Sequence, residues 1–78
     1  MDPAIAFGQV LRTLRKEAGL SQEQLSFEAG IERNFVSLIE RGVNQPTIRV
    51  IFKLANALDI PPSRMFVLVE EQIHNAKR

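Results

Sequence analysis

The 78-residue sequence contains no cysteine, no tryptophan and no tyrosine, and it has one histidine, His74. The absence of cysteine excludes disulfides, thiolate metal sites and a cysteine nucleophile. No apolar run approaches the roughly 20 residues that a membrane-spanning helix needs. The start, Met1-Asp2-Pro3, lacks the basic segment of a signal peptide. We therefore expect a cytoplasmic protein that contains no metal and no cofactor and has no membrane partner.

Side chains that carry out most enzymatic chemistry are scarce and scattered. His74 lies near the C-terminus, and the adjacent Glu70 and Glu71 point to different faces of a helix. Because no catalytic set is present in the sequence, we predict that the protein is not an enzyme. The net charge of +1 is too small to indicate nucleic-acid binding by itself. A case for DNA binding must rest on how the residues are arranged.

Apolar residues recur at helical spacing along the chain, and short turn sequences separate the segments. Gly19, Gly30 and Gly42 follow the last apolar positions of three successive segments, as helix-ending glycines do. No segment shows the alternation of a strand. The predicted class is all-α. We expect a single domain, 1–78, with five helices at about residues 3–18, 22–29, 33–41, 47–58 and 63–75.

Hydroxyl side chains mark three expected helix starts. Ser21 is followed three residues later by Gln24, which is a capping-box pattern. Thr47 is suited to cap the fourth helix and Ser63 the fifth, because a hydroxyl oxygen can accept a hydrogen bond from a free backbone amide of the first turn.

The two short helices at 22–29 and 33–41 are the most informative part of the chain. Helices of about eight residues are unstable alone and must be held by their neighbours. The turn between them is centred on Gly30, which can adopt a positive φ, and the small Ala29 permits close approach. This arrangement predicts a helix-turn-helix whose second helix is held out from the body of the domain.

Residues 11–60 resemble the phage-repressor-like regulators, also called the Cro/C1-type or XRE family. The segments GLSQEQL, AGIERNFVSLIERG and QPTIRVIFKLANALDI fall in the family's order and spacing. The short chain and its fifth helix resemble most the controller proteins of restriction–modification systems. The resemblance implies a compact lambda-repressor-like domain that binds double-stranded operator DNA as a homodimer and regulates transcription.

The resemblance places the first turn of the helix at 33–41 in the major groove. Arginine can bind guanine O6 and N7, and asparagine can bind adenine N6 and N7, so Arg33 and Asn34 are the strongest candidates. Phe35 could contact a thymine methyl or pack in the core, and Ser37 could instead bond to the preceding turn. The predicted base-contact residues are Arg33, Asn34, Phe35, Ser37 and Leu38.

Phosphate contacts are expected beside this helix. Gln22 matches the family's phosphate-clamping glutamine and starts a helix, where free N–H groups face an anion. Its alternative role is that of an ordinary surface or capping residue. The predicted phosphate contacts, which fix register without reading sequence, are Gln22, Arg41, Asn44, Gln45 and Arg12.

Arg15 and Glu40 match a pair that usually forms an internal salt bridge in the family. The resemblance therefore assigns them to structure and not to DNA binding. Removing one partner of such a buried pair costs about 3–5 kcal/mol, so a mutation there would mimic loss of function by unfolding.

The last predicted helix has more apolar surface than one protomer can cover. Residues 65–69 are five apolar residues in succession, and Ile73 follows. A helix that is apolar on more than one face is buried on more than one side, most simply against its own copy across a two-fold axis. The predicted interface residues are Met65, Leu68, Val69 and Ile73. Recognition helices about 34 Å apart would then bind a pseudo-palindromic operator.

Control of a restriction–modification operon is the leading hypothesis for the chain. A phage or mobile-element repressor is the alternative within the same class, and an antitoxin-type protein-interaction module is the alternative outside it. A neighbouring methyltransferase or endonuclease gene would favour the controller, and a toxin gene would favour the antitoxin. If the protein activates transcription, RNA polymerase becomes a further partner.

Overall fold

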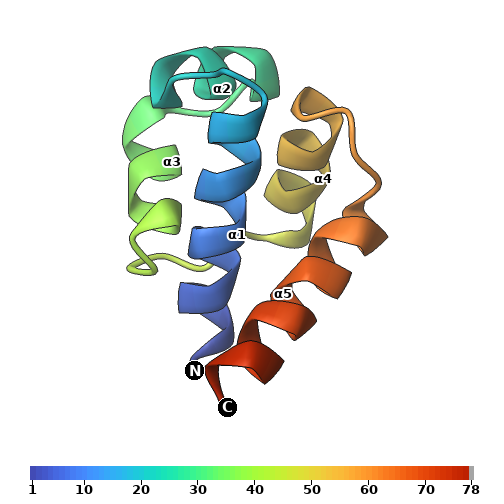
Figure 1. Ribbon diagram of the computed structural model, residues 1–78. Coiled ribbons are helices and arrows are strands. Elements are labelled where there is room, and N and C mark those ends of the chain that lie inside the picture. Colours follow the sequence, from blue (N-terminus) through green and yellow to red (C-terminus); the bar gives the residue numbers. More distant parts are fainter. Residues whose placement is uncertain (78) are drawn as a thin grey trace.

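The computed structural model describes residues 1–77, and in that range five helices and no strand occur (Figure 1). The helices are α1 (Pro3–Glu17), α2 (Gln22–Ala29), α3 (Arg33–Glu40), α4 (Ile48–Ala57) and α5 (Pro62–Ala76). The predicted all-α class with five helices is confirmed. The helix ends differ from the expected ones by no more than one residue. A difference of this size is within the range over which helix termini fray.

Side-chain caps start α2 and α4 at the expected residues. Ser21 Oγ accepts a hydrogen bond from the Gln24 amide at 3.0 Å, and Gln24 Oε1 accepts one from the Ser21 amide at 2.8 Å. This reciprocal pair is the predicted capping box. Thr47 Oγ1 accepts a hydrogen bond from the Val50 amide at 3.2 Å. Each cap satisfies a backbone amide that the helix itself leaves free.

The expected cap at Ser63 is wrong. α5 begins one residue earlier, at Pro62, and Pro61 is its N-cap, without a side-chain capping hydrogen bond. A proline suits the first helical position because its missing N–H would have no partner there in any case. Pro61 and Pro62 together therefore form the start of α5.

α1 runs through the centre of the domain, with α3 on one side and α4 and α5 on the other (Figure 1). Side chains from all five helices fill the core between them. The largest fully buried side chains are Leu11, Leu25, Val36, Ile39, Leu54 and Met65. Met65 and Val69, which we expected at a dimer interface, are both buried inside the protomer. Since they have almost no free surface left for a partner, the structure assigns them to the core.

Two phenylalanines on other helices point away from this core. Phe27 on α2 is 87% exposed, and Phe52 on α4 is 59% exposed. The helical spacing of apolar residues does not distinguish such positions from core positions when a helix carries apolar residues on several faces.

α1 and α3 cross in direct backbone contact at Gly8. A Cβ atom on Gly8 would lie 2.4 Å from the Ile39 carbonyl oxygen and 2.7 Å from that of Glu40. Backbone atoms this close cannot move aside without shifting a whole helix. The crossing therefore requires glycine in the middle of α1, although glycine lowers helix propensity there.

We predict that Gly8→Ala lowers the free energy of unfolding by about 1–3 kcal/mol, because the added methyl group overpacks the α1–α3 contact. Urea unfolding followed by circular dichroism measures the change. Thr13→Ala, at an exposed position of the same helix, is the control and should leave the stability nearly unchanged. A Gly8→Ala protein as stable as the wild type would show that α1 and α3 do not touch here.

Candidate nucleic-acid interface

α2 and α3 are joined by a tight turn that is centred on Gly30. Gly30 has φ +70° and ψ +36°, the left-handed conformation that glycine adopts without strain. The amide of Ile31 donates a hydrogen bond to the Ser26 carbonyl oxygen at 3.0 Å and so closes the end of α2. Leu25 and Val36 are buried where the two helices meet. α3 also packs on α1, so two helices hold its inner side while its outer side is free.

A buried ion pair fixes α3 to α1. Arg15 Nε donates to Glu40 Oε2 at 2.6 Å, and Arg15 Nη2 donates to Glu40 Oε1 at 3.0 Å. The two side chains are only 10% and 3% exposed. The hydrogen bond with Glu40 raises the pKa of Arg15, while burial opposes the shift. The guanidinium therefore stays charged, and the pair that the resemblance implied is present in the structure.

The first turn of α2 contacts both ends of α3. Gln22 Nε2 donates a hydrogen bond to Glu40 Oε1 at 3.1 Å, at the C-terminal end of α3. Glu23 Oε2 lies 3.6 Å from Arg33 Nη1, at the N-terminal end. We did not predict either contact from the sequence. Both depend on the angle at which α2 crosses α3, and sequence spacing does not reveal that angle.

The outer side of α3 carries the predicted base-contact residues. Arg33 and Asn34 are exposed in the first turn. Phe35 is half-buried and packs against the core, so its apolar surface is shared between the interior and the outside. Ser37 and Leu38 are also half-buried, one turn further along. The first turn of α3 is thus the most accessible part of the helix.

The predicted phosphate-contact residues lie around α3. Arg41 and Gln45 are exposed just after the C-terminal end of α3. Asn44 is held in the same loop by its backbone amide, which donates a hydrogen bond to the Leu38 carbonyl oxygen at 3.3 Å. Gln22 uses one amide N–H for Glu40 and retains a second one. Arg12 is exposed on α1. It lies one helical turn from Gly8 and from Arg15, which both contact α3, so it belongs to that side of α1.

Exposed apolar side chains gather on the opposite side of α1, on α4 and α5. We call Ile48, Phe52, Phe66 and Val67 the α4–α5 patch; all four are exposed. Phe66 also lines a shallow hollow with Pro46 and Ile51 at the start of α4. None of these four residues was predicted from the sequence to lie at an interface. Leu68 and Ile73, which we expected at an interface, are half-buried on α5.

Comparison with known proteins agrees with this geometry. A helix-turn-helix family model matches residues 11–65, from within α1 to the first turn of α5. The chain belongs to the helix-turn-helix family of DNA-binding transcriptional regulators. It is 37% identical over 59 residues to the control protein C.BamHI of Bacillus amyloliquefaciens, covering 74% of this chain and 73% of that protein. It is 35% identical over 60 residues to the uncharacterised HTH-type transcriptional regulator y4dJ of Sinorhizobium fredii, covering 77% and 78%.

Two solved structures extend the comparison. The restriction–modification controller protein C.AhdI from Aeromonas hydrophila is 47% identical, with a TM-score of 0.78 over 80% of this chain and 94% of that one. The controller protein C.Esp1396I, solved as a tetramer with its natural 35 base-pair operator, has a TM-score of 0.85. At 23% identity over 94% of this chain and 96% of that one, it supports the fold alone. The protein is a helix-turn-helix regulator of the controller type.

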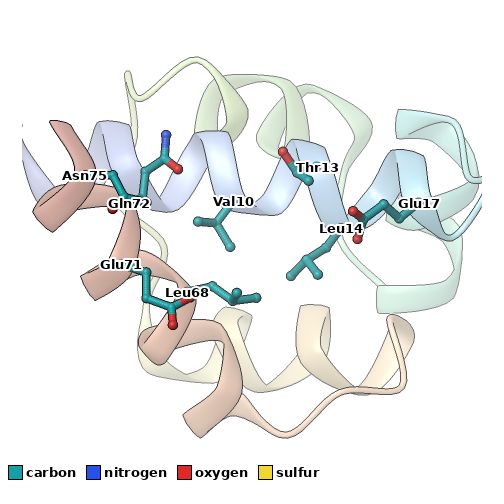
Figure 2. A pocket seen from close by; sticks show the side chains of 8 residues that line it. All are labelled: Val10, Thr13, Leu14, Glu17, Leu68, Glu71, Gln72 and Asn75. Atoms are coloured by element: carbon teal, nitrogen blue, oxygen red, sulfur yellow. The ribbon is translucent and has the colours of Figure 1, made fainter.

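Outside the helix-turn-helix, a cleft of about 200 Å³ lies between α1 and α5 (Figure 2). Val10, Leu14 and Leu68 form its apolar floor, while Glu17 and Glu71 lie at opposite ends of it. Within residues 1–77, no three histidine, aspartate or glutamate side chains are grouped so that they could bind a metal ion. In the same range, no helix combines the length and the apolar character that crossing a membrane requires.

We predict that Arg15→Ala lowers the free energy of unfolding by about 3–5 kcal/mol, because it leaves the buried Glu40 carboxylate without its cation. Thermal unfolding followed by circular dichroism measures the loss. Arg12→Ala removes an exposed arginine from the same helix and should change the stability by no more than about 0.5 kcal/mol. Equal effects of the two substitutions would contradict a structural role for the Arg15–Glu40 pair.

Proposed function

We propose that the protein is a homodimeric, sequence-specific transcriptional regulator that binds a pseudo-palindromic operator with α3 in the major groove. The observation that carries this proposal is the exposed first turn of α3, on a helix whose inner side is fixed by the buried Arg15–Glu40 pair. A rigid support is what base recognition needs, because the side chains must reach the base edges in one geometry.

In this proposal Arg33 and Asn34 supply the direct base contacts. Arginine donates two hydrogen bonds to guanine, and asparagine exchanges two with adenine, each giving about 1–3 kcal/mol of discrimination. Ser37 and Leu38 lie one turn further along and border the same groove, and Phe35 offers its outer edge to a thymine methyl. All of them are at least partly accessible on α3.

Phosphate contacts on both sides of α3 would hold the reading helix in register. Gln22 approaches from the start of α2 with its second N–H, and Arg41, Asn44 and Gln45 approach from the loop after α3. Arg12 extends this set along α1. Such contacts supply affinity and orientation but do not distinguish sequences.

We predict that Arg33→Ala lowers the preference for operator over random DNA by about 1–3 kcal/mol, most of it at one base position in each half-site. Arg41→Ala should weaken binding to all sequences and lower the salt dependence, as expected for a phosphate contact. Fluorescence anisotropy at two salt concentrations separates the two effects. No preference of the wild-type protein for any sequence would refute the proposal and point to a protein partner.

The α4–α5 patch is the surface that we propose for dimerisation. Two of its members, Ile48 and Phe52, are one turn apart on α4, and Phe66 and Val67 extend it onto α5. A patch of this kind is self-complementary across a two-fold axis, since each copy presents the same apolar surface. Leu68 and Ile73 would lie at its margin.

We predict that Phe52→Glu raises the dimer dissociation constant at least about tenfold, because it places a charge in a desolvated apolar contact. Sedimentation equilibrium measures the change. Phe27→Glu is a matched control, since Phe27 is even more exposed but lies on α2, outside the patch. If both variants associate like the wild type, the dimer uses another surface.

Similarity to the control protein C.BamHI and the controller protein C.AhdI supports a finer assignment, the control of a restriction–modification operon. No separate ligand domain is needed for this role, because dimerisation makes operator occupancy depend steeply on protein concentration. Activation from such an operator would add a contact with RNA polymerase, whereas repression needs none. A methyltransferase or endonuclease gene beside this one would agree with the assignment, and a toxin gene would contradict it.

A further inference from the structure

Glu23 has no part in the proposed DNA contacts, but it lies beside Arg33, which is proposed to contact a base. Glu23 Oε2, in the first turn of α2, lies 3.6 Å from Nη1 of Arg33, the first residue of α3. The Glu23 side chain is 76% exposed and that of Arg33 65% exposed. A separation of 3.6 Å is too long for a hydrogen bond, so the two groups attract each other as charges.

The contact leaves Arg33 free to bind a base. A guanidinium has five N–H donors in a fixed plane, and Glu23 lies beside only one of its two terminal nitrogens. The remaining donors on that end are enough for the two acceptors of a guanine edge. At the same time, attraction to Glu23 limits the directions that the long, flexible arginine side chain takes.

We propose that Glu23 is a positioning residue that sets the base specificity of Arg33. This inference rests on the proposed function, in which Arg33 reads a base. In water an exposed ion pair is weak. When Arg33 enters the groove, water is excluded and the attraction to Glu23 strengthens, but only in the geometry that also contacts the correct base.

Glu23 also acts against the wrong sequences. A carboxylate beside the reading helix repels the DNA phosphates, so it weakens binding that depends on charge alone. At the correct base this repulsion is offset, because Arg33 bridges the carboxylate and the guanine. Specificity is the difference between the affinity for the operator and the affinity for other sequences. Glu23 increases this difference by favouring the first and weakening the second.

The test uses purified full-length protein and the tightest duplex selected from a random library. Glu23→Gln is compared with Glu28→Gln, which removes the same charge from an exposed position of the same helix. Both substitutions are made in the wild-type protein and in Arg33→Ala. Binding is measured to the selected duplex, to each of its single-base variants and to random DNA, and thermal midpoints verify folding.

We expect Glu23→Gln to lower the preference at the base read by Arg33 about twofold to fivefold and to leave the other positions unchanged. It should also tighten binding to random DNA. Glu28→Gln should not change the preference at that base, and Glu23→Gln should have no further effect on preference in the Arg33→Ala protein. A merely structural role for Glu23 would instead weaken binding at every position alike.

Three results would overturn the inference. They are an unchanged preference in Glu23→Gln, an equal change in Glu28→Gln, and an effect that persists in Arg33→Ala. If Arg33→Ala alters a base preference and Glu23→Gln does not, only this inference fails. If Arg33→Ala alters none, the proposed reading role of Arg33 fails and this inference fails with it.

Discussion

The Glu40 carboxylate joins three helices and determines how α3 is held. It extends from α3, accepts two hydrogen bonds from Arg15 on α1 and a third from Gln22 on α2. Arg15 also donates to the Leu20 carbonyl oxygen at 2.8 Å and so secures the turn between α1 and α2. A buried carboxylate without such partners is costly, so other arrangements of the three helices are strongly disfavoured.

Gly8 makes this network possible. Because Gly8 has no side chain, the backbone of α1 approaches the last carbonyl groups of α3 directly. Glu40 therefore contacts α1 twice, through its backbone at Gly8 and through its carboxylate at Arg15. α3 therefore rests on a backbone surface and an ion pair, with little freedom to rotate. The orientation of α3 also fixes the direction of its first turn, which lies at the opposite end from Glu40. From the start of α2, Gln22 contacts the C-terminal end of α3 and Glu23 contacts the N-terminal end.

Local chemistry explains what the sequence predicts well. Capping by Ser21 and Thr47 and the left-handed turn at Gly30 depend on residues near each other in the chain. The sequence does not show which residues of α5 face the core and which are exposed, because residues 65–69 are all apolar and have no helical period. Met65 and Val69 proved to face inward, and Phe66 and Val67 outward. The Arg15–Glu40 pair was predicted from the family resemblance and not from residue spacing. The contacts of Gln22 and Glu23 with α3 depend on the angle between α2 and α3, which the sequence does not reveal.

The low net charge of the protein bears on both of its proposed surfaces, the DNA-binding face of α3 and the α4–α5 patch. Arg33 and Arg41 border the proposed reading face, but Glu23 and Glu32 lie beside it, and the whole chain carries only +1. Because counterion release scales with the number of phosphates neutralised, one protomer gains little affinity from charge alone. In the proposed dimer, joining two protomers through the α4–α5 patch would make binding of the second half-site intramolecular and so raise the effective concentration. In that arrangement the low charge would favour specificity, and dimerisation through the apolar patch would supply the affinity that charge does not.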